Sequence, residues 1–168
     1  LNAMLVKNLN ISPLQAELVS RDLIRPYLGN SEQLLGNVRV GITFQVELAG
    51  SGTAGTAPRY GALLKACGLS ETVVASTSVT YAPVSTAFSS ATIYFNNDGV
   101  LHKATGCRGT FTMNCELGQI PTIDFTMTGI YNAPTDTAAP TVTYSAQATP
   151  LIFREGNTSA DRKSTRLN

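Results

Sequence analysis

The glycine-rich segment at residues 50–68, GSGTAGTAPRYGALLKACG, has features of a loop that could hold a phosphate. Closely spaced glycines let backbone N–H groups converge on an anion. A phosphate loop also needs a Gly-Lys-Ser/Thr sequence, which is absent, and a dinucleotide loop needs a surrounding βαβ unit. Pro58 suits the first position of a helix, and Gly68 suits the position just after its end. We therefore predict a flexible connector followed by a short helix over residues 58–68.

Candidate acid–base residues are few and scattered. The chain has one histidine, His102, and no G-x-S-x-G nucleophile sequence. Glu47, Glu116 and Asp124 could meet across a sheet as the carboxylate pair of a glycosidase. They fit better as solvent-facing members of polar strand faces, so we predict no catalytic residue and no enzymatic activity.

The three cysteines, Cys67, Cys107 and Cys115, are an odd number and form no C-x-x-C pair. Cys107 and Cys115 are expected in one extended strand, too far apart to bond to each other. With a single histidine and no ligand spacing, a zinc site is not expected. The sequence predicts reduced thiols, no disulfide, no metal and no cofactor.

The overall composition excludes several classes of partner. Charged residues make up only 14% of the chain and the formal net charge is +1, which gives no general attraction to nucleic acid or anionic membrane. No apolar run approaches the length of a membrane span. Polarity comes instead from Ser and Thr, and Thr favours strands.

Strict alternation of apolar and polar residues marks three strands, over 37–48, 109–117 and 120–130. The connector GQIP predicts a hairpin between the last two, and Asn97-Asp98-Gly99 predicts another turn. Weaker patterns predict strands over 2–9, 14–24, 71–77, 78–83, 91–95, 141–146 and 150–153. We predict a mainly β fold of two packed antiparallel sheets, sandwich-like or barrel-like, with one short flanking helix.

The polar faces of the three clear strands are rich in threonine and poor in charge. A sheet face exposed to water in a soluble monomer normally carries more Lys and Glu. A hydroxyl-rich face with few charges suggests a surface that must stay wet but does not bind tightly. The residues expected on them are Arg39, Thr43, Gln45, Glu47, Thr110, Thr112, Asn114, Glu116, Thr122, Asp124, Thr126 and Thr128.

Ordered blocks of the sequence resemble the major tail (tail tube) proteins of long-tailed bacteriophages and prophages. The blocks are ELAGSGTAGTAPRYGALLKACGLSETV, SVTYAPVSTAFSSATIYFNNDGVLHKATGCRGTFTMNC and IPTIDFTMTGIYNAPTD, within residues 38–150. The resemblance implies homo-hexameric rings stacked into a tube, in which four strands per subunit close a ring-wide inner β-barrel. It implies that double-stranded DNA passes through the lumen on ejection. We then expect the polar faces to line this lumen, where Glu47, Glu116 and Asp124 would add a mild negative potential.

Further expectations follow from this resemblance. The partners would be other tail proteins (tape measure, tail tip and tail terminator), and the protein would be made in the host cytoplasm and located in the virion tail. The glycine-rich loop would contact a neighbouring subunit through Gly50, Ser51, Gly52, Thr53, Gly55 and Thr56. Residues 1–153 would form a single tail-tube domain, truncated at its N-terminus, and 154–168 a polar tail whose end resembles translated vector sequence.

Two other functions compete with this interpretation. A monomeric β-sandwich adhesin or carbohydrate-binding module would need exposed aromatic side chains on a flat face, but the chain has no Trp and only 7% aromatic residues. A β-sandwich hydrolase would need a clear acid–base pair. Rings or tubes in electron micrographs would separate a tube protein from both.

Overall fold

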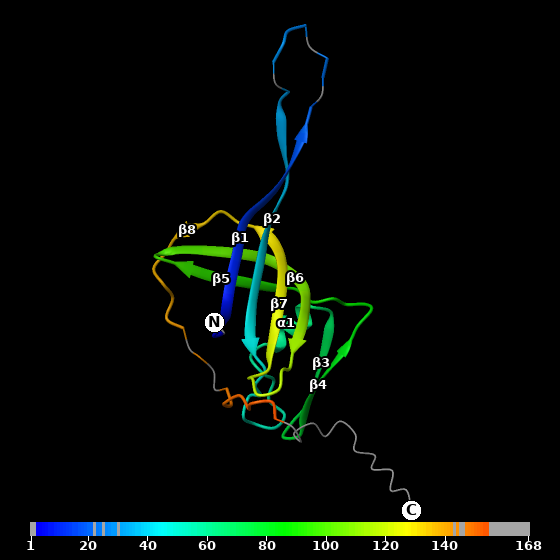
Figure 1. The fold of residues 1–168 in the computed structure, drawn as a ribbon, viewed down its shortest axis with the longest axis vertical. Helices are drawn as coiled ribbons and strands as arrows, with labels where there is room; N and C mark the ends of the chain where they lie inside the picture. Colours follow the sequence, from blue (N-terminus) through cyan, green and yellow to red (C-terminus); the bar gives the residue numbers. More distant parts are fainter. Residues whose placement is uncertain are drawn as a thin grey trace, which may run out of the picture.

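The fold is described from a computed structural model that covers residues 3–21, 23–24, 26–29, 31–142, 144 and 147–154. Strands dominate these residues and one short helix accompanies them, which confirms the predicted mainly β class (Figure 1). The elements are β1 (Lys7–Ser20), β2 (Gln33–Glu47), α1 (Gly61–Ala66), β3 (Leu69–Val74), β4 (Ser78–Pro83), β5 (Ala91–Asn97), β6 (Val100–Asn114), β7 (Thr122–Tyr131) and β8 (Thr135–Asp136).

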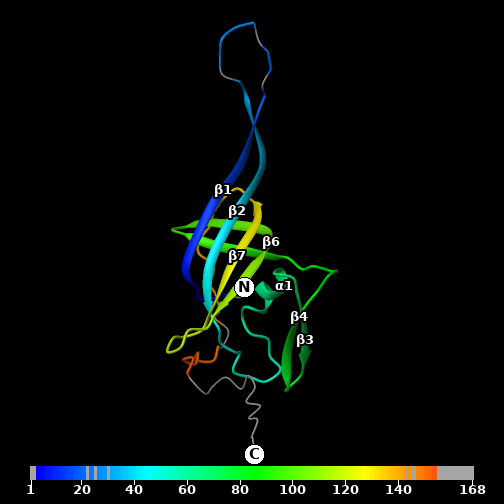
Figure 2. The ribbon, with the colours of Figure 1, turned by 45° about the vertical axis from the view of Figure 1, so that its right-hand side comes forward.

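A large antiparallel sheet has the strand order β1-β2-β7-β6-β5, and β8 pairs with β6 outside this path. β3 and β4 form a separate two-stranded sheet beside α1 (Figure 2). The predicted hairpin across GQIP is confirmed as β6–β7. The predicted turn after β5 is also confirmed, because Asp98 and Gly99 both have positive φ, as a tight hairpin turn requires.

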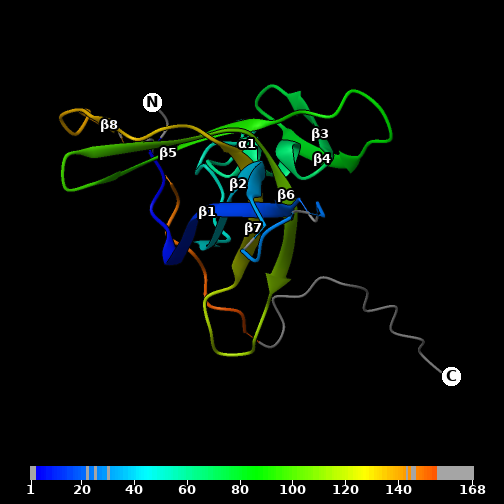
Figure 3. The same ribbon diagram turned by 90° about the horizontal axis from the view of Figure 1, so that it is seen from above.

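The large sheet curls because β6 is bent. Its pairing with β7 shifts register between Thr105 and Arg108, where Gly106 adopts a φ of 60°. Such an irregularity bends the strand and increases its twist. As a result, β5 and the first half of β6 cross the direction of β1, β2 and β7 (Figures 1 and 3).

The core lies between the large sheet and α1. Phe44, Phe125 and Phe111 are direct neighbours across β2, β7 and β6, and the Phe44 and Phe125 rings stack with centroids 5.5 Å apart. Leu63 and Leu64 of α1 join the same buried cluster. The alternation in the sequence therefore places one face of each central strand inside the subunit.

The helix is shorter than predicted. It begins at Gly61 rather than Pro58, because the Pro58 carbonyl accepts a hydrogen bond from the Gly61 N–H in a preceding turn. Its end was predicted correctly, since Gly68 follows the last turn with a φ of 88°.

A two-stranded arm projects from the sheet (Figure 1). The strands predicted at 2–9 and 14–24 are one strand, β1, and β2 begins at Gln33 rather than 37. β2 pairs with β7 only from Arg39 onward, so within the described part of the chain residues 33–38 have β1 as their only strand partner. We call residues 16–38, as far as the structure describes them, the arm.

Other strand boundaries also differ from the predictions. β4 has the predicted bounds, β5 extends two residues beyond its predicted end, and β3 covers 69–74 rather than 71–77. No strand forms in the described parts of 141–146 and 150–153, and the short β8 lies where no strand was predicted. Within the described residues, no helix is long and apolar enough to cross a membrane.

Candidate functional site

Three neighbouring strands bring most of the predicted polar residues onto one face. β7 lies between β2 and β6, so each cross-strand row takes one residue from each strand. One row is Thr43, Thr126 and Thr110; the next is Gln45, Asp124 and Thr112; the third is Glu47, Thr122 and Asn114. We call these nine residues, with Thr128 and Arg39 above them, the polar face.

The polar face points away from the core, because its residues alternate along each strand with buried residues. Val40, Ile42, Phe44 and Val46 of β2 are buried, as are Ile123, Phe125 and Met127 of β7. Thr43, Thr110, Thr112 and Thr126 are exposed, whereas Gln45, Thr122 and Asp124 are half-buried. The face therefore presents hydroxyl groups to solvent over a packed apolar layer.

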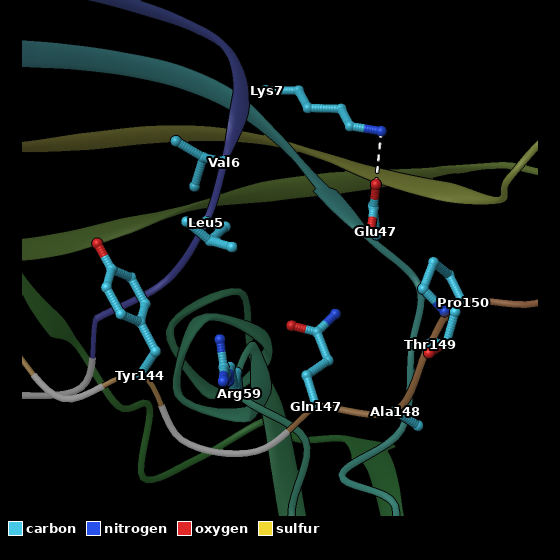
Figure 4. Close-up of a pocket in the computed structure, with 10 residues that line it drawn as sticks. All are labelled: Leu5, Val6, Lys7, Glu47, Arg59, Tyr144, Gln147, Ala148, Thr149 and Pro150. Atoms are coloured by element: carbon cyan, nitrogen blue, oxygen red, sulfur yellow. Dashed lines mark ion pairs between the residues drawn. The ribbon is translucent and has the colours of Figure 1, made fainter.

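The carboxylates on the polar face have close partners. Lys7 Nζ lies 2.6 Å from Glu47 Oε1 (Figure 4). Asn114 Nδ2 donates to Asp124 Oδ2 over 2.5 Å, and Asn8 Nδ2 donates to Gln45 Oε1 over 2.6 Å. Asp124 Oδ1 is buried and has no partner within the described chain. These contacts hold the acidic side chains against the sheet.

The C-terminal boundary predicted for the strand over 109–117 is wrong. β6 stops at Asn114, and Glu116 lies in the connection to β7, where its carbonyl accepts from the Gln119 N–H. Met113, expected inside the subunit, is 51% exposed, and Leu117 is also exposed. Nothing in the described chain covers this corner of the sheet, so the apolar side of the strand stays open to solvent there.

Two basic residues that were not predicted on the polar face also belong to it. Arg108 of β6 pairs with Thr128 of β7. Lys7 of β1 reaches the polar face through its ion pair with Glu47. Arg108 could have been found from the alternation that continues through Thr110 and Thr112. Glu116 does not belong to the polar face. The face therefore carries three basic residues, Lys7, Arg39 and Arg108, and two acidic residues, Glu47 and Asp124. This balance does not support the expected negative potential.

The candidate catalytic and metal-binding residues are not brought together. The His102 ring stacks on Phe95, with centroids 4.6 Å apart and planes within 4°. In the described part of the chain, no three His, Cys, Asp or Glu residues are grouped as a metal site would require. Cys107 is buried, which raises the pKa of its thiol and makes the thiolate less available.

The glycine-rich loop folds back on itself. Ser51 Oγ lies 2.9 Å from the carbonyl oxygens of both Thr53 and Thr56, which share its single donor proton. The Gly50 carbonyl accepts from the Ala148 N–H, and Gly55 approaches the backbone of β3 at Val74. The loop therefore joins the end of β2 to the small β3–β4 sheet.

A comparison with known protein families shows which family this chain matches. The family described as phage tail tube protein matches residues 10–161, which is most of the chain. Neither a curated protein nor a solved structure matches it. The matched region contains the polar face, the arm and α1, and the family's role is that of a structural component of the virion tail. The chain belongs to the phage tail tube protein family.

Proposed function

We propose that this chain forms hexameric rings that stack into a tail tube, and that double-stranded DNA passes through the tube on ejection. The observation that carries the proposal is the polar face. Its strands bury their apolar side in their own subunit, so the threonine-rich side is free to line a water-filled lumen.

The open edges of the sheet support a ring-wide barrel. Among the described residues, β1 pairs only with β2, and residues 108–114 of β6 pair only with β7. Unpaired strand edges tend to join another strand. Pairing β1 of one subunit with β6 of the next would extend the four strands β1, β2, β7 and β6 around the ring and remove both edges.

The surface chemistry of the face suits a moving polyanion. DNA affinity increases with each Lys or Arg that contacts a phosphate. On this face Lys7 is held by Glu47, and most of the remaining groups are hydroxyls and amides. Arg39 and Arg108 are too few to give a dense cationic grip, so DNA would slide rather than bind.

The remaining contacts belong to the same proposal. The loop residues Gly50–Thr56 lie beside β3–β4 and would touch a neighbouring subunit. Other tail proteins, including tape measure, tip and terminator proteins, would meet the ends of the tube. The chain would be made in the cytoplasm of the host bacterium.

Electron microscopy of the purified protein tests the ring directly. We expect end-on images with sixfold symmetry and side views of stacked rings. A monodisperse monomer at all concentrations, or rings with another symmetry, would contradict the hexameric tube.

A further inference from the structure

A cavity of about 510 Å³ lies beside the start of β1 (Figure 4). Its walls come from the segment before β1, the end of β2, the turn before α1, and residues 144 and 147–150. Leu5, Val6 and Tyr144 give it an apolar side, and Arg59 adds a guanidinium group. We call it the Arg59 cavity.

Arg59 has no anionic partner within the described chain. Its side chain is half-buried, its Nε is buried without a hydrogen-bond acceptor, and the ion pairs of the described residues do not include it. Lys7, the other basic residue of the cavity, is already paired with Glu47. A buried donor without an acceptor destabilises the folded chain. The Arg59 cavity is therefore suited to an occupant that brings a carboxylate, which can accept from two guanidinium N–H groups.

The connection between β6 and β7 carries complementary groups. Glu116 and Leu117 are both exposed there. The Glu116 carboxylate takes part in none of the ion pairs of the described residues. Within one subunit, β2 and β7 separate this connection at the end of β6 from the cavity at the start of β1. The connection therefore offers a carboxylate next to an apolar side chain to a different copy of the chain.

Strand directions bring this connection to the cavity of an adjacent subunit. Each neighbouring pair among β1, β2, β7 and β6 is antiparallel, so β1 and β6 run in opposite directions. Lys7 pairs with Gln45 near the end of β2, and one row further Glu47 and Asn114 both pair with Thr122. The start of β1 and the end of β6 thus lie at the same end of the sheet, and rotation about a ring axis keeps them there. Where β6 of one subunit joins β1 of the next, the chain after β6 meets the segment before β1.

We propose that Glu116 and Leu117 of a second copy of this chain, the neighbour in the ring, occupy the Arg59 cavity. The Glu116 carboxylate accepts hydrogen bonds from the Arg59 guanidinium, and Leu117 packs against Leu5 and Tyr144. One copy leaves this site incomplete, because it holds the guanidinium at one edge of the sheet and the carboxylate at the other. The contact rests on the proposed ring and specifies which side chains join adjacent subunits.

Cysteine cross-linking tests this contact, because Cys115 precedes Glu116 and is exposed. Leu5→Cys is introduced beside the native Cys115, and assembled rings are oxidised. We expect covalent species of two to six chains on a non-reducing gel and none larger, because the contact runs around one hexameric ring. Two controls should give only single chains: Leu5→Cys with Cys115→Ser, and Thr72→Cys, on exposed β3, with the native Cys115.

Charge reversal gives a second, independent test. Glu116→Lys should raise the protein concentration needed for ring formation about tenfold, because two cations would then meet in the Arg59 cavity. Adding Arg59→Glu should restore assembly close to the parent concentration. The matched control Asp136→Lys, at an exposed position of β8 that does not line the cavity, should assemble like the parent.

Several results would overturn the contact while leaving the ring intact. One is cross-linking of Leu5→Cys no stronger than in the controls, or species larger than six chains. Another is assembly of Glu116→Lys at the parent concentration, or a double variant that is folded by circular dichroism yet as defective as Glu116→Lys. If Arg59→Glu prevents folding, the cross-linking decides alone. Absence of rings in the parent protein would instead contradict the proposed function itself.

Discussion

Glu71 links α1 to the small sheet at the level of single side chains. Tyr81 Oη donates to Glu71 Oε2 over 2.6 Å, and Lys65 Nζ lies 3.0 Å from Glu71 Oε1. The Tyr81 hydrogen bond, with help from Lys65, lowers the pKa of Glu71, although partial burial opposes it. Burial and the Glu71 contact raise the pKa of Tyr81. The three residues therefore favour a charged glutamate beside a neutral tyrosine.

The lowered pKa of Glu71 predicts an acid-sensitive contribution to stability. A carboxyl whose pKa is depressed in the folded state stabilises the fold above its unfolded pKa, near 4.5, and loses this contribution as the pH falls through the folded pKa. Glu71→Gln should therefore lower the free energy of unfolding by about 1 kcal/mol at pH 7. Urea unfolding of parent and variant should converge below pH 4, and a constant difference down to pH 2 would contradict this role.

The cluster of Lys65, Glu71 and Tyr81 leaves no space for a side chain at Gly61. A Cβ at this position would collide with the Tyr81 hydroxyl and lie 2.8 Å from Glu71 Oε2. Gly61→Ala should therefore destabilise the subunit by about 1–3 kcal/mol, despite the better helix propensity of alanine. Thermal unfolding would measure the effect. Gly50→Ala, where the nearest atom is 4.0 Å away, is the control and should change stability far less.

Among the elements, the arm differs most from the rest of the subunit. Its residues are exposed on both strands, including Leu18, Val19, Leu34 and Leu35. An isolated two-stranded ribbon is only marginally stable in water. The arm therefore depends on contacts outside its own subunit far more than β7, whose apolar side is fully buried.

This difference predicts an uneven pattern of hydrogen exchange. In the isolated subunit, amides of the arm should exchange orders of magnitude faster than those of β7, because opening the arm exposes no core. Assembly into tubes should slow the arm strongly and β7 little. Mass spectrometry of both forms would measure this, and an arm that exchanges equally in both would show that it stays free in the tube.

The central strands could be read from the sequence because burial imposes a period of two. Val40, Ile42, Phe44 and Val46 lie over the core, and their alternation predicted β2 correctly there. The arm end of β2 has no buried side, so no alternation marked its start at Gln33. The bend at Gly106 depends on how β6 pairs with β5 and β7, which no local pattern contains.

At the scale of the whole molecule, sequence recognition and structure contribute different information. The family could be recognised from ordered blocks of residues, and the family comparison confirms it. The cross-strand rows of the polar face could be identified only from the register of the strands, because Thr43, Thr126 and Thr110 come from distant parts of the chain. The cavity of about 510 Å³ beside Arg59 could not be predicted, since residues from four separated parts of the chain line it.

The proposed lumen predicts a charge-sensitive rate of DNA passage. Thr112→Lys with Thr126→Lys would add two cations per subunit on exposed positions of the polar face. Phage carrying this pair should form normal tails but eject DNA severalfold more slowly, and more so at low salt, where screening is weaker. Time-resolved ejection measured by DNA-dye fluorescence would test this.

The control for this experiment places the same charge elsewhere. Thr72→Lys on β3 should eject DNA at the parent rate. If the Thr112 and Thr126 pair prevents tail assembly while Thr72→Lys does not, the face is packed between subunits and does not line the lumen.

The open edges of the large sheet have a consequence for the number of subunits in a ring. The free edges of β1 and β6 are unlike, so each subunit joined through them in the proposed ring would cover one free edge and supply another. Growth of this kind stops only when the last subunit meets the first. The rotation between neighbouring subunits, rather than any single contact, would then set how many subunits a ring holds.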